Sequence, residues 1–388
     1  MVAAVILPGS PGGWPACARL PRPRAVRISV RMTNRLPSLR GIGEDMTVSN
    51  RLRLEAEALN APAVRQPSRR AGSIRRTSSL QTLWKPDDDR SYAVVGRARD
   101  LATSATCDAI VVGEDAISAT VSAEGRLASL TGNRLKDRLE RFAGLRPGGE
   151  LRKAMARDMA EECRAETRLH RLLDDLPGAA FLSVAAWYAW EGGVEGHAAR
   201  TMSMSRLSRP VEGVCLSYVR GSSSMTEDGR GIDKNADHPV GPLPLATDDP
   251  LGFHSLVETD DPNQWRLRRT DLWCEDGNLV VDAWFQDSSG IEHDPVRRVI
   301  FHEYGLVAHI DAGSLDITAI SVTPHVLPYV TCHAAPATAE LLIGRNVREL
   351  RGLVPVLLKG SAGCTHLNDM LRALQNVAGL ADLLQLQQ

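Results

Sequence analysis

Five short stretches of the sequence recur in the same order in two parts of the chain, and this recurrence limits the possible folds more than any other feature. The matches are RRT at 75–77 with RRT at 268–270, ARD at 98–100 with FQD at 285–287, the strand-like stretches 117–130 and 306–320, GGELR at 148–152 with VRELR at 347–351, and LLDDL at 172–176 with HLNDM at 366–370. Each match is short, but their shared order predicts an internal duplication. The alternative is that ordinary strand and turn patterns produced the likeness independently.

Each of the two parts begins with strand patterns and ends with helical ones. In the first part, alternating apolar residues predict strands at 92–95 and over 108–130, and apolar residues at helical spacing predict a helix over 150–173 and another after Pro177. In the second part, strands are expected at 265–273, 279–287, 297–303, 306–311 and 315–322, and helices near 336–343, 346–358 and 365–377. The expected fold class is α+β, with a small antiparallel sheet packed against C-terminal helices in each part.

Other segments flank and separate these two parts. Residues 1–65 are rich in Arg and Pro and lack sustained periodicity, which predicts a disordered basic tail. The internal methionines Met32 and Met46 leave open a translation start further along the chain. The expected organisation is the tail 1–65, a first repeat 66–190, a Gly-, Pro- and Asp-rich linker or long loop 191–263, a second repeat 264–380 and a short tail 381–388.

The charge of the chain is balanced overall but not along its length. The net charge of −1 argues against a dedicated nucleic-acid-binding protein, which usually has a strong basic excess. Residues 1–80 nevertheless hold 14 Arg against 4 acidic residues, and such a basic arm can contact phosphate, although charge runs of this kind are more often solvated tails. Nucleic acid is therefore a disfavoured partner, while a homo-oligomer stays open and no specific partner is identified.

Cysteine usage and hydropathy suggest a compartment. Seven cysteines are scattered without a dense framework, which predicts reduced thiols in a cytoplasm. The longest apolar run, residues 176–190, is interrupted by Pro177 and Gly178 and is shorter than the ~20 residues that a membrane-spanning helix needs. A soluble cytoplasmic protein without membrane contact is expected.

Several blocks of this sequence resemble a known bacterial family. These blocks are RRTSSLQTLW, VVGRARDL, RLLDDLPGAA, VDAWFQDS, HEYGLVAHID, VLPYVTCHAA and, most specifically, GCTHLNDMLRAL. Over roughly residues 66–380 the chain is similar to the domain-of-unknown-function 2889 family. The resemblance implies a bacterial intracellular protein and assigns no chemistry.

The strongest candidate for chemistry is a Cys/His cluster near the end of the chain. It comprises Cys332, Cys364, His366 and Asp369, with Gly363 permitting a tight turn before a helix that starts near Thr365. A helix N-terminus lowers the pKa of a thiol and favours the thiolate, which binds metal or attacks electrophiles. Sulfur and imidazole donors together suit zinc or iron, and Asp369 would act as a ligand or would orient His366.

A structural interpretation of the same residues competes with the metal site. Free Cys is often buried as a small hydrophobe, Thr365 can cap the helix, and Asp369 suits a first helical turn. The wide separation of Cys332 from Cys364, without a CxxC pair, is not a recognised zinc spacing.

Other candidates carry less weight. His302 and Tyr304 alternate on an expected strand, where core or cross-strand packing is the common role. Asp174 and Asp175 are expected as helix caps, and His254 as an exposed residue beside the linker.

Three function classes follow from the sequence. The first is a protein that binds zinc, iron or an iron–sulfur cluster through the Cys/His cluster. The second is a non-catalytic ligand- or partner-binding protein in which the GCTHL turn is structural. The third is an enzyme with Cys364 as nucleophile and His366 as base. The sequence does not decide whether the protein is an enzyme, nor does it identify a cofactor beyond these metals.

Overall fold

The computed structural model describes residues 59–85, 88–190, 211–222, 238–245 and 248–385, together with the short strand β1 (Val5–Ile6) and residues 193, 224, 225 and 229. Most of the predicted tail 1–65, much of the predicted linker 191–263 and the last three residues lie outside this described part.

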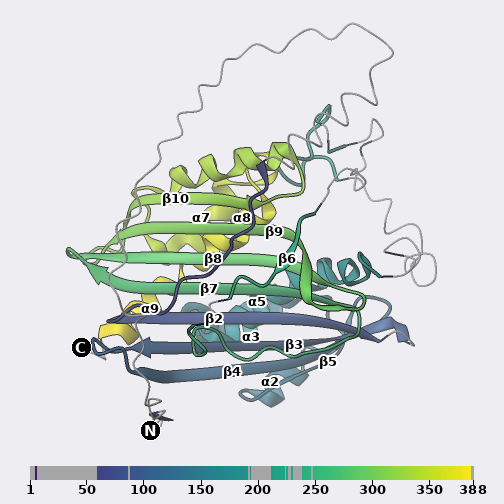
Figure 1. Cartoon of the computed structure of the whole chain (residues 1–388), viewed down its shortest axis with the longest axis horizontal. Helices are drawn as coiled ribbons and strands as arrows, with labels where there is room; N and C mark the ends of the chain where they lie inside the picture. The colour runs from purple at the N-terminus through teal and green to yellow at the C-terminus, as the bar shows by residue number, and fades with distance from the viewer. Residues whose placement is uncertain are drawn as a thin grey trace, which may run out of the picture.

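The described strands form one antiparallel sheet (Figure 1). Besides β1, its members are β2 (Ser73–Lys85), β3 (Asp88–Thr103), β4 (Ala109–Val121), β5 (Leu127–Gly132), β6 (Val240–Pro242), β7 (Asn263–Glu275), β8 (Asn278–Ile291), β9 (Asp294–Asp311) and β10 (Ile317–Val326). Their order is β1-β4-β3-β2-β7-β8-β9-β10, with β5 beside β4 and β6 beside β9. The α+β class expected from the sequence is confirmed.

The two expected small sheets are joined into this single sheet. Strands β2 and β7, the first long strands of the two parts, pair along their length, with Ser73 opposite Trp273 and Leu83 opposite Asn263. This pairing satisfies backbone groups that would otherwise be two exposed sheet edges. On either side of it, each strand of the series β2 to β5 and of the series β7 to β10 pairs with the next along the chain. The duplication itself stays a prediction.

Helical segments follow each series of strands. After β5 come α2 (Lys136–Glu140), α3 (Gly149–Asp158), α4 (Ala160–Arg164), α5 (Arg168–Phe181) and the 3₁₀ helix η1 (Ser183–Trp187). After β10 come η2 (Val330–Leu342), η3 (Val347–Glu349), α7 (Leu350–Leu357), η4 (Gly360–Ala362), α8 (Thr365–Ala373) and α9 (Asn376–Gln385). Across the residues that the structure describes, no helix combines the length and apolar character needed to cross a membrane.

Helices α5 and α8 lie on the same face of the sheet (Figure 1). Asp175 of α5 pairs with Arg268, and Asp369 of α8 pairs with Arg266. These two arginines are two positions apart on β7, so their side chains leave the strand on one side. The opposite face is covered in part by the segment that contains His254, which hydrogen-bonds to side chains of β2.

Charged residues divide the core on the helix side of the sheet. One hydrophobic cluster includes Leu80, Val94 and Leu172 from the first part of the chain. Another includes Phe285, Tyr304 and Leu371 from the second. Between them, the central strands carry three buried arginines, which are Arg76, Arg266 and Arg268. The sheet therefore has a buried polar seam where its two parts meet.

Several local predictions need correction. The helix expected over 150–173 is divided into α3, α4 and α5, and α5 continues through Pro177, after which a separate helix was expected. Strand β2 was not expected, because its polar sequence lacks apolar alternation, yet it is buried at nearly every position. Strand β9 continues through Gly305, where two separate strands were expected. The helix expected near 336–343 is the 3₁₀ helix η2, which contains Pro336. Proline lacks the backbone N–H that a regular α-helix would use there.

Candidate functional site

Asp287 and His302 are placed together by strand pairing. They are direct partners in the antiparallel pair β8–β9, so their side chains leave the sheet side by side on the face that carries the helices. A register irregularity follows Asp287, between it and Ser288. The Asp287 side chain is fully buried, and His302 is only 8% exposed. Oδ2 of Asp287 lies 3.7 Å from Nδ1 of His302.

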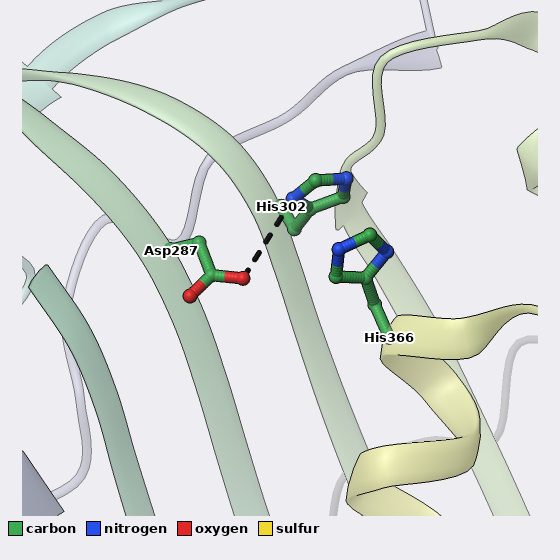
Figure 2. Close-up of side chains that lie close together, drawn as sticks. All are labelled: Asp287, His302 and His366. Carbon is green, nitrogen blue, oxygen red and sulfur yellow. Dashed lines mark ion pairs between the residues drawn. The ribbon is translucent and has the colours of Figure 1, made fainter. Parts of the chain in front are cut away.

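His366 reaches this pair from the first turn of α8. Figure 2 shows Asp287 and His302 on neighbouring strands and His366 approaching them from the helix. The rings of His302 and His366 are stacked, with centroids 3.5 Å apart and planes inclined by 19°. The side chains of Asp287, His302 and His366 each offer one ligand atom, and these atoms all lie within 4.8 Å of one another. Within the described part of the chain, no other group of three His, Cys, Asp or Glu side chains meets this condition.

Both imidazoles are held in the neutral form. Burial, together with the charges of Arg266 and Arg268, lowers the pKa of His366 to about 3. Burial and the neighbouring His366 hold the pKa of His302 well below its ordinary value. A neutral imidazole has a free nitrogen lone pair, which is the form that coordinates a metal ion. Near neutral pH, protons therefore do not compete with a cation for these two nitrogens.

Arg266 fixes the position of the Asp287 carboxylate. Its Nε donates to Oδ1 at 2.9 Å and its Nη2 donates to Oδ2 at 2.9 Å, which is the bidentate arrangement typical of Arg and Asp. Arg266 also lies 3.4 Å from Asp369 and 3.9 Å from Asp175. Three carboxylates therefore surround this buried guanidinium, and Asp287 keeps lone pairs that do not accept from Arg266.

The two sequence-predicted cysteines lie in the hydrophobic core of the second part. Cys332 belongs to η2, and its Sγ lies 2.9 Å from Oγ of Ser217. Cys364 directly precedes α8 and receives a hydrogen bond from the Tyr304 hydroxyl at 3.5 Å. Both thiols therefore have hydroxyl partners, and neither belongs to the group formed by Asp287, His302 and His366.

Burial acts against thiolate formation at both cysteines. It raises the pKa of Cys332 to about 12. It also raises the pKa of Cys364, although hydrogen bonds from Tyr304 and from backbone groups of α8 act in the opposite direction. The thiolate predicted from the position of Cys364 at a helix N-terminus is therefore opposed by desolvation. Cys364 is consequently protonated near neutral pH.

The cysteines differ in exposure and bonding. The free thiols among the described residues are Cys163, Cys215, Cys274, Cys332 and Cys364, of which Cys274 is exposed. Cys107 is disulfide-bonded, so the prediction of reduced thiols throughout the chain does not hold for this residue.

The other two sequence-predicted site residues have separate partners. His366 stacks on His302, and Asp369 forms ion pairs with Arg266 and Arg372. Sequence reasoning missed Asp287 and treated His302 as a cross-strand packing residue, which describes its pairing correctly. The sequence held two polar motifs that could have pointed to the site. These are Gln-Asp-Ser at 286–288, at the end of one expected strand, and His-Glu-Tyr at 302–304, at the end of the next. Only the pairing register, which the sequence did not supply, turns these two motifs into neighbours.

Asp174 and Asp175 do not cap a helix, contrary to the sequence interpretation. Both lie inside α5, whose N-cap is Thr167, and both are buried. Asp175 accepts two hydrogen bonds from Arg268, at 2.8 and 2.9 Å, and Asp174 lies 3.1 Å from Arg351. Asp175 belongs to the polar seam, where it neutralises the buried Arg268, and both carboxylates accept from the buried Arg171.

His254 is buried, so the expectation that it is exposed was wrong. Its two ring nitrogens lie 2.8 Å from Oγ1 of Thr77 and 2.7 Å from Oγ of Ser79. It therefore ties the covering segment to β2.

Comparison with known proteins places the candidate site inside a family match. Residues 265–379 match the model of a family described as "Protein of unknown function (DUF2889)", which confirms the resemblance over this range. The match extends from β7 into α9 and contains Asp287, His302 and His366. No curated protein and no solved structure matches the chain.

Proposed function

We propose that the protein binds a divalent transition metal ion through Asp287, His302 and His366, which lie in the region 265–379 that matches the DUF2889 family model. The observation that carries the proposal is the convergence of two imidazoles and one carboxylate from β8, β9 and α8. Three ligands from separate elements would also join the sheet to the helix that covers it.

The donor set suits zinc or iron(II). Two His and one carboxylate form zinc sites with a further position for water, and the same combination binds iron(II) in non-haem centres. Both imidazoles are neutral, so neither has to lose a proton on binding.

An unpaired buried atom supports the same interpretation. Nδ1 of His302 is buried and has no hydrogen-bond partner among the described residues. Leaving such an atom without any partner costs about 1–3 kcal/mol. Coordination to a metal ion would satisfy this nitrogen while Asp287 contributes the charge.

The charges around the site are arranged to hold Asp287 in place. Arg266 orients the carboxylate, as groups behind metal ligands commonly do. A divalent cation near the Arg266 guanidinium would be repelled by its positive charge. Asp175 and Asp369, which lie near Nη1 of Arg266, reduce this repulsion. Asp369 thus acts through Arg266 in this proposal, where the sequence interpretation made it a ligand or a partner of His366.

The test is the metal content of purified full-length protein after loading with zinc or iron(II) and removal of the excess ion. Wild type should retain about one ion per chain, as expected for a single three-ligand site. His366→Gln should lose most of it, because one of three donors is gone. His309→Gln is the matched control, since His309 lies exposed on β9, and it should bind like wild type.

The cysteine variants separate this site from the one predicted from the sequence. If Cys332→Ser or Cys364→Ser abolishes binding while His366→Gln does not, the ion is held by sulfur and the proposal fails. The proposal also fails if wild type retains no zinc and no iron.

A non-catalytic binding protein with a structural GCTHL turn is the second candidate, and the packing of that turn favours it. A Cβ added at Gly363 would approach the Leu358 carbonyl oxygen to 2.5 Å. The Gly363 carbonyl accepts a hydrogen bond from Leu216 N at 2.9 Å. Absence of metal from wild type, combined with loss of stability in variants of this turn, would support this candidate.

A further inference from the structure

A buried arginine lies on the face of the sheet opposite the candidate metal ligands. Arg298 belongs to β9, and its guanidinium lies over the ring of Trp265, 3.7 Å from the ring centroid. Trp265 directly precedes Arg266 on β7, so its side chain leaves the strand on the face away from the helices. Arg298 is only 6% exposed, so most of this side chain is removed from water.

The charge of Arg298 is not neutralised by any residue that the structure describes. Arg75 on the same face and Arg266 on the other each form an ion pair with an aspartate. Burial lowers the pKa of Arg298 to about 9, and within the described chain no carboxylate opposes this effect. The guanidinium is therefore still charged near neutral pH. A buried charge without a counter-ion is costly, which favours an anion from outside the described chain.

The contacts of Arg298 fix its guanidinium and leave one nitrogen available. Nε donates to Oγ of Ser288 at 3.0 Å, and Nη2 donates to Oδ1 of Asn263 at 2.9 Å and to the Ser288 carbonyl oxygen at 3.3 Å. Nη1 has no hydrogen-bond partner among the described residues, and it is not buried, so it keeps contact with solvent. Both strand partners of Arg298, Gly241 on β6 and Gly290 on β8, lack a side chain that could supply a negative charge.

We propose that Arg298 binds an anionic oxygen group of a small molecule, either a carboxylate or a phosphate, through Nη1. A guanidinium that is held on an aromatic ring and by neutral acceptors is already oriented for an oxyanion, so little entropy is lost on binding. The ligand supplies the negative charge that the described chain lacks. This site lies on the other face of the sheet from Asp287, His302 and His366, so it does not depend on the proposed metal ion.

The test follows thermal unfolding of the full-length protein in sodium chloride that is partly replaced by sodium acetate or sodium phosphate at constant ionic strength. At least one of the two oxyanions should raise the midpoint of wild type saturably, by roughly 1–3 °C, and the larger shift identifies the class of ligand. Arg298→Met removes the charge and keeps an apolar chain beside Trp265, and it should lose the response. Arg297→Met is the matched control, because Arg297 is 62% exposed and pairs with Asp294, and it should respond like wild type.

A crystal of the wild-type protein grown with the oxyanion that gives the larger shift provides a readout that needs no variant. Density for that oxyanion within hydrogen-bond distance of Nη1 of Arg298 would support the proposal. Density for water alone at this position would overturn it. The proposal is also overturned if neither oxyanion shifts the midpoint of wild type, or if Arg298→Met responds as strongly as wild type, because the anion would then act elsewhere.

Discussion

Asp287 and His302 lie directly opposite each other on β8 and β9, with Oδ2 of the carboxylate 3.7 Å from Nδ1 of the imidazole. This relationship places a fully buried acid beside a neutral base under the first turn of α8. The position of Asp287 beside His302 depends on the central sheet and on Arg266. Variants of the residues around the proposed metal site therefore test it as directly as variants of the three ligands.

Replacing Arg266 by Met should strongly destabilise the protein. The change leaves Asp287 and its neighbours without the guanidinium that they share, and removal of one partner from a buried ion pair costs about 3–5 kcal/mol. Urea denaturation measures the difference. Arg297→Met is the control, because this arginine pairs with Asp294 while 62% exposed and should matter little. Equal losses in the two variants would contradict the account of the seam.

His254 should make the free energy of unfolding depend on pH in the acidic range. Burial, followed by the charges of Arg99 and Arg97, lowers the pKa of His254 from 6.5 to about 3. Between these values the unfolded chain binds a proton at this residue and the folded chain does not, so its contribution to stability falls as pH decreases. The slope is about 1.4 kcal/mol per pH unit for one such group.

His254→Gln removes this titration. The variant should lose stability at neutral pH, because the ring bonds to Thr77 and Ser79. The difference between wild type and variant should then shrink from pH 6 to pH 4 in urea unfolding curves. A difference that stays constant over this range would show that His254 does not resist protonation in the folded protein.

Gly363→Ala tests the turn that positions α8. The added Cβ would approach the Leu358 carbonyl oxygen to 2.5 Å and Leu358 Cβ to 2.8 Å, so backbone must move. The expected loss is about 1–3 kcal/mol, as for other overpacked sites. Gly352→Ala in α7 is the control, since its Cβ would meet no atom within 4 Å and alanine favours a helix. Thermal unfolding that ranks the two variants in the opposite order would contradict this packing.

Thiol labelling should divide the cysteines by their surroundings. Cys274 is exposed and should react first with a maleimide, whereas Cys332 and Cys364 should react only after unfolding. Mass spectrometry of the partly labelled chain identifies the order, and Cys274→Ser should remove the fast phase. Rapid labelling of Cys364 in the folded protein would revive the interpretation of this residue as a nucleophile.

The strands of the second part could be predicted because their sequences alternate. Each strand from β7 to β10 overlaps an expected strand, since apolar side chains at every second position face the core. Strand β2 could not be found in this way. Its buried positions include Arg75 and Arg76, which are neutralised by Asp271 and Asp100, and ion pairing between distant strands leaves no local pattern.

The candidate site could be predicted only in part from the sequence, for a related reason. His366 was identified because it stands in a distinctive turn at a helix start. Its partners Asp287 and His302 come together through strand register, which short motifs do not encode. The cysteines attracted attention by their chemistry, whereas their burial depends on how η2 and α8 pack. Residue type predicted where a site could lie, and tertiary structure determined which side chains meet there.

The most direct measurement is X-ray absorption spectroscopy of the zinc-loaded full-length protein. The account predicts a first shell of nitrogen and oxygen only, at about 2.0–2.2 Å, with the outer-shell signature of imidazole from His302 and His366. A sulfur scatterer at about 2.3 Å would contradict it, because the ion would then be held by Cys332 or Cys364.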